Sequence, residues 1–180
     1  MIRRINVIGG PGCGKTVMAA GLFTRLKKLG HNVELIDEYV KAWAYQGRQR
    51  KKYDQLILFA RQLDREYLVL SSVDDIVIVT ESPSAMSVPY ARMHGFPEWE
   101  SLLKIAMSFE RDFPSYNIFL ERNDCPYEEV GRYETIDEAE EMDRAILSFM
   151  SEDMGVPLAI VGYDQEDMAF ELVKGALSRC

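Results

Sequence analysis

The stretch of residues 9–16, which reads Gly-Gly-Pro-Gly-Cys-Gly-Lys-Thr, decides the fold of this chain. It matches the pattern G-x-x-x-x-G-K-[ST], whose glycines and lysine are typical of a loop that binds phosphates. The loop directly follows an apolar run, residues 5–8, and precedes a helix-like stretch, residues 17–29. This is the strand–loop–helix context that the motif requires. The sequence therefore predicts a site for a nucleoside triphosphate.

The residues of this loop are expected to bind ATP together with Mg²⁺. Glycines let the backbone turn tightly, so that successive N–H groups point at one phosphate, and the N-terminus of the following helix adds a partial positive charge. Lys15 is expected to reach the β- and γ-phosphates, and the hydroxyl of Thr16 is expected to bind Mg²⁺. The expected nucleotide-binding residues are Gly10, Gly12, Cys13, Gly14, Lys15 and Thr16.

The composition is typical of a globular protein with a single domain. The 180 residues are 47% hydrophobic and 28% charged, with a net charge of −8. No apolar run approaches the length of a membrane span, so we expect a cytoplasmic protein without membrane contact. The acidic balance argues against a surface that coats nucleic acid. Cys13, Cys125 and Cys180 are widely spaced, which fits a reducing compartment better than a disulfide framework.

Strand-like and helix-like segments alternate along the whole chain. The predicted strands are residues 5–8, 33–36, 76–79, 116–120 and 157–161. The predicted helices are residues 17–29, 39–45, 53–73 and 98–113, one from a capping box at Thr135 to about Met154, and one capped by Asp164. Such alternation predicts βαβ units. We therefore expect one α/β domain over residues 1–180, a P-loop NTPase fold with a five-stranded parallel sheet and helices on both faces.

Acidic residues follow the second and third predicted strands. Asp37 and Glu38 follow residues 33–36, and Glu81 follows residues 76–79. Ligands of parallel sheets bind at the carboxyl ends of the strands, where these carboxylates meet the phosphate loop. We expect Glu38 to be the general base, with Asp37 as the alternative, and Glu81 to serve Mg²⁺ or its water shell. The competing interpretation is that they are ordinary acidic loop residues.

A lid is predicted over residues 122–135, between the fourth strand and the next helix. The segment contains Pro126 and Gly131 and shows no apolar periodicity, so we expect it to be mobile. Arg132, and also Arg122, are expected to close over the transferring phosphoryl group and to neutralise charge in the transition state. The alternative is that both are solvated loop arginines.

A basic cluster lies after the second strand, in an otherwise acidic chain. Its charges are Arg48, Arg50, Lys51 and Lys52. They are suited to attract the phosphate of a nucleotide or of a nucleic-acid backbone, although a solvated turn has the same composition. Nearby aromatic residues are candidates for stacking on a base or for the core: Trp43, Tyr45, Tyr90, Phe96 and Trp99.

With these residues the chain resembles small-molecule P-loop kinases. It is similar to the nicotinamide-riboside-kinase-like AAA-type ATPase group and, more distantly, to deoxyribonucleoside kinases. Residues 38–43, Glu-Tyr-Val-Lys-Ala-Trp, resemble the Glu-Pro-x-x-x-Trp segment of the latter family, in which the Glu is the base and the Trp lines the acceptor pocket. Glu81-Ser82 stands in place of that family's Glu-Arg-Ser, without its Arg, and residues 131–134 resemble a kinase lid without the usual paired arginines.

The resemblance implies ATP-dependent transfer of the γ-phosphoryl group to a hydroxyl of a nucleoside, a nucleotide or a modified base. Comparable P-loop kinases of bacteriophages with modified DNA phosphorylate 5-hydroxymethyluracil within the polymer, so DNA is an alternative acceptor. An alternative of another class is an ATPase or switch that acts on a protein partner. The guanine-reading Asn-Lys-x-Asp motif of GTPase switches is missing from the sequence, and the chain has no room for the helical lid domain of oligomeric motor ATPases.

Overall fold

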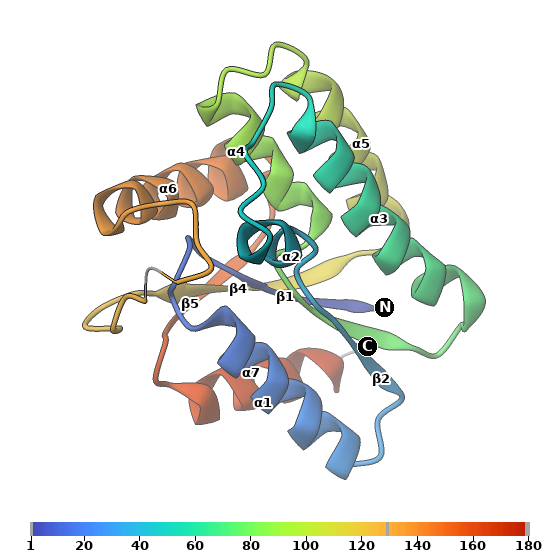
Figure 1. Ribbon diagram of the computed structural model, residues 1–180. Coiled ribbons are helices and arrows are strands. Elements are labelled where there is room, and N and C mark those ends of the chain that lie inside the picture. Colours follow the sequence, from blue (N-terminus) through green and yellow to red (C-terminus); the bar gives the residue numbers. More distant parts are fainter. Residues whose placement is uncertain (1, 129, 179–180) are drawn as a thin grey trace.

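The computed structural model describes residues 2–128 and 130–178 and contains one sheet of five strands in the order β2-β3-β1-β4-β5 (Figure 1). All of its strand pairs are parallel. The strands are β1 (Arg4–Ile8), β2 (Val33–Ile36), β3 (Val77–Glu81), β4 (Ser115–Glu121) and β5 (Leu158–Gly162). The predicted parallel sheet of a P-loop NTPase is therefore confirmed.

Helices cover both faces of the sheet, as predicted. Figure 1 shows α1 (Lys15–Lys28) and α7 (Glu166–Leu177) below the sheet, and α3 (Asp54–Ser72), α4 (Ser87–Met93), α5 (Trp99–Asp112) and α6 (Ile136–Ser148) above it. The short helix α2 (Val40–Tyr45) follows β2. Among the described residues, no helix is both long and apolar enough to cross a membrane.

The core has a layer on each face of the sheet, and β1 is buried along its whole length between β3 and β4. On the lower face, Leu22 and Leu26 of α1 pack with Val173 of α7. On the upper face, Phe119 of β4 packs with Met142 of α6. Ile5 and Val7 of β1 belong to the lower layer and Ile8 belongs to the upper one, whereas Arg4 and Asn6 are buried polar residues of the same strand.

The N-terminal cap of α6 is the predicted one, whereas the N-terminal cap of α7 differs from the prediction. The hydroxyl of Thr135 accepts a hydrogen bond from Glu138 N, and the Glu138 carboxylate accepts one from Thr135 N at 2.8 Å, so the predicted capping box is present. The predicted cap at Asp164 is wrong: α7 begins at Glu166, its N-cap is Gln165, and no side chain caps it. Asp164 lies too early because the turn after β5 takes up one more residue.

Two other helical segments differ from the expectation. The α-helical part of α6 ends at Ser148, and a π-helical turn, Phe149–Asp153, continues to the predicted end of the helix. Helix α4 and the 3₁₀ turn Ser84–Met86 before it were not predicted. Pro83 and Pro89 obscure the helical pattern of this stretch, but Pro89 lies in the first turn of α4, where a missing N–H is tolerated.

A carboxylate is fully buried between the sheet and α3. Glu66 is 0% exposed; it accepts a hydrogen bond from Ser84 N at 2.6 Å and pairs with Arg4 at 3.4 Å. Burial raises the pKa of Glu66 to about 7, although Arg4 acts in the opposite direction. The folded state therefore holds a proton on Glu66 at pH values where the unfolded chain has released it.

We expect stability to fall as the pH rises from about 4.5 to about 7, because unfolding releases the Glu66 proton in this window. The expected loss is on the order of 3 kcal/mol at most. Glu66→Gln keeps an acceptor for Ser84 N and removes the titrating carboxyl group. The midpoint temperature of unfolding of this variant should therefore change less with pH across this window. Equal pH dependence of thermal unfolding in both proteins would contradict the prediction.

Candidate active site

The phosphate loop connects the end of β1 to the start of α1. Gly12 and Gly14 adopt left-handed backbone conformations, with φ of 75° and 84°, which favour glycine. Lys15 is only 8% exposed, and its ammonium donates to Gly10 O at 2.7 Å. The Lys15 side chain therefore packs against the backbone of the phosphate loop.

The expected nucleotide-binding residues of the loop do not all face the same way. Gly12, Gly14, Lys15 and Thr16 line a cavity at the carboxyl edge of the sheet. Cys13 is fully buried, with its thiol in the lower core, so only its backbone is available to a ligand. Gly10 N donates to Asp143 Oδ1 at 2.5 Å. Gly10 therefore contacts α6 rather than the cavity.

Thr16 and Glu81 come together as expected for a magnesium site. The Thr16 hydroxyl donates to Glu81 Oε2 in a short hydrogen bond, and burial raises the pKa of Glu81. The described residues contain no cluster of three or more acidic, His or Cys ligands. A hydroxyl and one carboxylate nonetheless fit Mg²⁺, which usually completes its shell with phosphate oxygens and water. Thr16 and Glu81 are the residues that would hold the ion or its water shell.

We expect Glu81→Gln to weaken the Mg²⁺ dependence of ATP binding, because the amide keeps the shape of the side chain and removes its charge. Higher Mg²⁺, or Mn²⁺, should restore part of the loss. The measurement is a metal titration of ATP binding by calorimetry, with Glu34→Gln, an exposed carboxylate on β2, as the control. An unchanged Mg²⁺ titration for Glu81→Gln would show that Glu81 does not contribute to the metal site.

Glu38 and Asp37 point in different directions, although they are adjacent in the chain. Glu38 lines the cavity and accepts a hydrogen bond from the Ser82 hydroxyl at 2.7 Å. Ser82 has a φ of 66°, which is rare for a residue other than glycine and is found where a site demands it. The Asp37 side chain is 73% exposed and pairs with Arg65 at 2.7 Å. Of the two carboxylates, Glu38 is therefore the one directed at the cavity.

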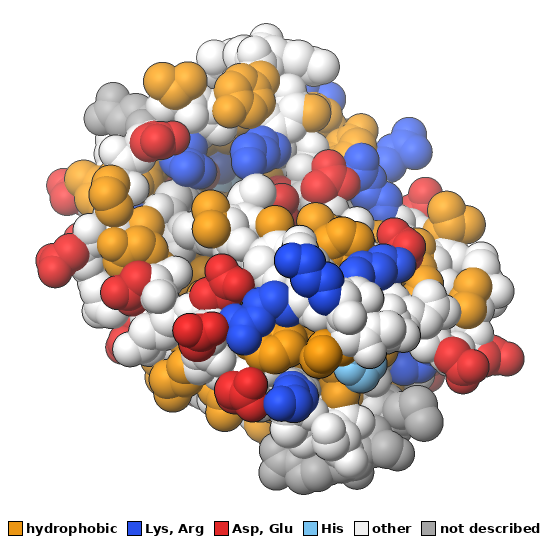
Figure 2. All heavy atoms as spheres, turned by 90° about the horizontal axis from the view of Figure 1, so that it is seen from below, with side chains coloured by type: hydrophobic (Ala, Val, Ile, Leu, Met, Phe, Trp, Pro, Cys, Tyr) orange, Lys and Arg blue, Asp and Glu red, His pale blue; other side chains and the backbone are white. Residues whose placement is uncertain are grey.

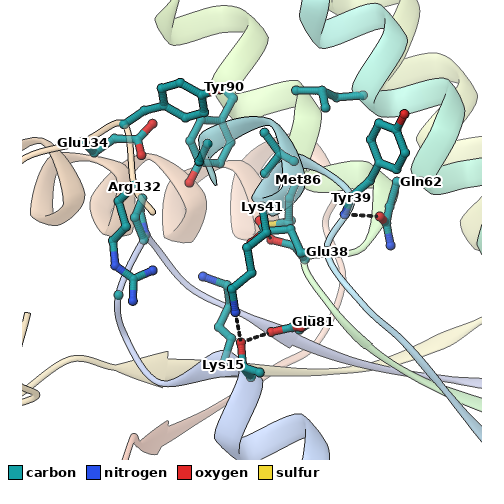
Figure 3. Close-up of a pocket in the computed structure, with 18 of the residues that line it drawn as sticks. Lys15, Glu38, Tyr39, Lys41, Gln62, Glu81, Met86, Tyr90, Arg132 and Glu134 are labelled. Atoms are coloured by element: carbon teal, nitrogen blue, oxygen red, sulfur yellow. Dashed lines mark hydrogen bonds between the residues drawn. The ribbon is translucent and has the colours of Figure 1, made fainter. Parts of the chain in front are cut away.

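The cavity has a volume of about 260 Å³ and continues from the phosphate loop into an apolar pocket (Figure 3). Its near end carries Lys15, Thr16 and Glu81, and Glu38 lies between the two ends. The far end is formed by α2, α3, the 3₁₀ turn Ser84–Met86 and α4, with the side chains Val40, Gln55, Leu58, Met86 and Tyr90. This volume is close to the lower limit of ligand pockets, about 300 Å³.

The predicted lid lies against both ends of this cavity. Position 129 of the segment is outside the described residues. Arg132 lines the cavity and lies close to the phosphate loop: a Cβ added to Gly12 would be 3.4 Å from Arg132 Nε. Figure 3 shows Arg132 on the loop side and Glu134 nearer to Tyr90. The lid residues therefore form one wall of the cavity.

Arg122 occupies a different position from Arg132. It is 9% exposed, its Nε donates to Asp143 Oδ2 at 3.0 Å, and its Nη2 donates to Pro11 O at 2.7 Å. Asp143 also accepts from Gly10 N. Arg122 and Asp143 thus bind the two sides of the Gly10–Pro11 segment, and this favours a role for Arg122 in shaping the loop rather than in touching the phosphoryl group.

The basic cluster is engaged largely within the protein. Arg48 pairs with Asp54 at 2.7 Å and covers the ring of Trp43 at 3.4 Å. Arg50 pairs with Glu134 of the lid at 2.7 Å. Lys51 and Lys52 are exposed. The two arginines therefore connect the segment after α2 to α3 and to the lid.

The aromatic candidates separate into core and cavity. Trp43 is 6% exposed and Phe96 is 3% exposed. Trp43 does not line the cavity, contrary to what the resemblance implies, because its ring is covered by Arg48. Of the five aromatic candidates, Tyr90 alone belongs to the described lining of the cavity. Burial raises the pKa of Tyr90 well above its usual value, so its phenol stays protonated as a donor.

The sequence did not predict several cavity residues, among them Lys41, Gln55 and Gln62. Lys41 of α2 donates to the Thr16 hydroxyl at 3.4 Å and adds a second cation near Lys15. Gln62 accepts a hydrogen bond from Tyr39 N at 3.2 Å, and Gln55 also faces the cavity. No motif in the sequence marks Lys41, which lies in the short helix that follows Glu38.

The parallel sheet, the phosphate loop and the Thr16–Glu81 pair define this chain as a P-loop NTPase. A family model described as an AAA domain matches residues 4–167, so the chain belongs to the AAA domain family. A comparison with curated proteins finds no match. The family and the site together establish a nucleotide-binding domain of the AAA type.

Proposed function

We propose that this protein transfers the γ-phosphoryl group of ATP to a hydroxyl of a small acceptor, namely a nucleoside, a nucleotide or a modified base. The observation that carries the proposal is the single cavity that joins the phosphate loop to an apolar pocket, with Glu38 between them. A phosphoryl donor and an acceptor bound in one such cavity meet in a defined orientation, which supplies much of the catalysis in phosphoryl transfer.

In this proposal, each residue of the cavity has a separate role in the reaction. Lys15 and the backbone of the loop would hold the phosphates, and Thr16 and Glu81 would hold Mg²⁺, which would neutralise charge on the phosphates. Glu38 accepts the proton of the acceptor hydroxyl, with Ser82 fixing its orientation. Arg132 stabilises charge that develops on the phosphoryl oxygens. Arg122 and Asp143 keep the loop in shape.

The cavity supports a kinase more strongly than an ATPase that acts on a protein partner. A switch that acts on a protein partner needs a mobile surface that reports the state of the nucleotide, but it does not need an apolar pocket beside the phosphates. Here the pocket is walled by the lid residues Gly131, Tyr133 and Glu134. A wall of lid residues at this position limits the access of water to the phosphates and so protects ATP from hydrolysis.

The charges favour a free small acceptor over a base within DNA. Two of the four cations of the basic cluster, Arg48 and Arg50, pair with Asp54 and Glu134. On the face below the sheet, Figure 2 shows basic side chains mixed with acidic ones rather than a continuous basic band. A polymer that follows the surface relies on many unpaired cations. The 5-hydroxymethyluracil alternative therefore has less support than a nucleoside or nucleotide.

Arg132→Ala is expected to lower kcat about 100-fold or more while changing the Kd for ATP little, because its main contact would form in the transition state. The measurements are single-turnover transfer and binding of a non-hydrolysable ATP analogue. Arg144→Ala on α6 provides a control outside the cavity. Equal losses in ATP affinity and in rate would instead assign Arg132 to ground-state binding, and no loss would leave it a solvated loop arginine.

The proposal is tested by incubating the protein with ATP, Mg²⁺ and a panel of nucleosides, nucleotides and DNA that carries hydroxymethylated bases. Mass spectrometry then identifies any phosphorylated product. We expect ADP and a phosphorylated nucleoside or nucleotide in equal amounts. ATP consumption that is indifferent to every acceptor and that requires an added protein would support the ATPase alternative instead.

A further inference from the structure

The segment that follows β3 enters the site in a backbone conformation that needs support. Ser82 has a φ of 66°, which a residue with a side chain adopts only where its surroundings hold it there. This conformation brings the Ser82 hydroxyl to Glu38 Oε1, to which it donates at 2.7 Å. The contacts that hold residues 82–84 therefore also determine where the Glu38 carboxylate points.

Two hydrogen bonds hold residues 82–84 from opposite ends. At the first end, Ser82 N donates to Val7 O of β1 at 3.2 Å. At the other end, Ser84 N donates to Glu66 Oε1 of α3 at 2.6 Å. Glu66 is 0% exposed and Ser84 is 1% exposed, so the loss of this acceptor would leave a buried N–H group unpaired. Glu66 is therefore the anchor of this segment on the side of α3.

Glu66 itself is held by a charge on the central strand. Its Oε2 pairs with Arg4 of β1 at 3.4 Å, and Arg4 is 2% exposed. Burying such a pair costs free energy that an apolar residue of similar size would avoid. Glu66 is not among the described residues that line the cavity. Its hydrogen bond to Ser84 N is the contact that leads from this buried pair toward the site.

Glu110 of α5 offers a comparison within the same buried network. It also pairs with Arg4, and its carboxylate accepts hydrogen bonds from Ser115 N at 2.8 Å and from the Ser115 hydroxyl at 2.9 Å. Ser115 is the first residue of β4, so this contact lies at the end of the sheet opposite to the site. The two carboxylates share one arginine, and of the two Glu66 is the one that holds a segment of the cavity.

We propose that Glu66 is a positioning residue for the general base. By holding Ser84 N it keeps Ser82 in its left-handed conformation, and the Ser82 hydroxyl then directs Glu38 into the cavity. This inference rests on the proposed function, since Glu66 acts through Glu38. The metal site lies outside this chain of contacts, because Glu81 is still part of β3 and is placed by the pairing of β3 with β1.

The test compares Glu66→Leu, which removes the acceptor for Ser84 N, with Glu110→Leu, which disrupts the same network away from the site. We expect Glu66→Leu to lower kcat at least about tenfold, because a small displacement of a catalytic group slows a reaction strongly. Its Kd for an ATP analogue, and the Mg²⁺ dependence of that binding, should stay within about threefold of the wild type.

The control and a conservative variant complete the comparison, with all rates measured well below the unfolding midpoints. Glu110→Leu should keep kcat within about threefold of the wild type, although both leucine variants unfold at a lower temperature because each leaves a backbone N–H group without its acceptor. Glu66→Gln keeps an acceptor for Ser84 N and should recover most of the turnover that Glu66→Leu loses.

A double-variant cycle with Ser82→Ala separates positioning from general destabilisation. Because Glu66 acts through Ser82, the two variants should not be additive. Ser82→Ala should lower both kcat and the midpoint temperature of unfolding in the wild type and in Glu110→Leu, but it should change them little in Glu66→Leu. Glu66→Asp, which withdraws the carboxylate by one methylene group, takes the place of Glu66→Leu in the cycle if the leucine variant does not fold.

The inference is overturned if Ser82→Ala and the Glu66 variant are additive in the unfolding midpoint, or if Glu66→Leu and Glu110→Leu have equal kcat. Failure of the proposed function gives a different result. If the wild type phosphorylates no acceptor while the unfolding midpoints still show the coupling of Glu66 to Ser82, the proposed reaction is refuted and the role of Glu66 in holding Ser82 against Glu38 remains.

Discussion

Lys15→Ala is expected to abolish phosphoryl transfer while the fold persists. Lys15 is 8% exposed at the near end of the cavity, and its charge is expected to reach the β- and γ-phosphates. Losing one such preorganised contact typically costs about 3 kcal/mol or more, which is a factor of hundreds in rate. Single-turnover transfer measures the loss, and circular dichroism verifies the fold.

The matched control is Lys27→Ala, which removes a lysine from the last turn of the same helix. Lys27 makes an exposed ion pair with Glu34 at 3.3 Å, and such pairs contribute little. Its turnover should equal that of the wild type. Near-normal turnover of Lys15→Ala would show that the phosphate loop does not bind the triphosphate as described.

Glu38→Gln is expected to reduce kcat about 100- to 10,000-fold, the usual contribution of a general base. The amide keeps the shape of the side chain and an acceptor for the Ser82 hydroxyl, so the affinity for ATP should change little. Pre-steady-state transfer and binding of an ATP analogue measure the two quantities separately.

Asp37→Asn is the control for this variant, because Asp37 is exposed and pairs with Arg65 on the outside of the cavity. We expect its kcat to stay within a few-fold of the wild type. If Asp37→Asn were the damaged variant and Glu38→Gln nearly silent, the two assignments would have to be exchanged.

Much of the fold could be predicted from local sequence signals. The strand–loop–helix around residues 9–16 and the capping box at Thr135 are short-range features, and both are present in the structure. Helix α4 was missed because Pro83 and Pro89 obscure its pattern. Asp164 was misassigned because the position of a cap depends on the length of the turn before it, which composition does not reveal.

Within the site, only the residues that the order of the strands brings to one edge of the sheet could be predicted. The parallel sheet brings the phosphate loop, Glu38 and Glu81 to one edge, and Arg132 joins them from the lid. By contrast, the Arg50–Glu134 pair joins residues far apart in the sequence. Gln55 carries no motif at all, because its burial follows from how α3 packs. Such long-range contacts determine whether a polar residue serves the core, the loop or a ligand.

A kinase and an ATPase differ in where the γ-phosphoryl group of ATP goes. The decisive measurement follows ATP turnover in water enriched in the heavy oxygen isotope, with the best acceptor of the panel present. Transfer to an acceptor hydroxyl predicts a phosphorylated acceptor whose phosphate contains no oxygen from the solvent, and very little inorganic phosphate. Inorganic phosphate that carries solvent oxygen as the main product, with the acceptor unchanged, would show that the protein is an ATPase and would contradict the proposed kinase activity.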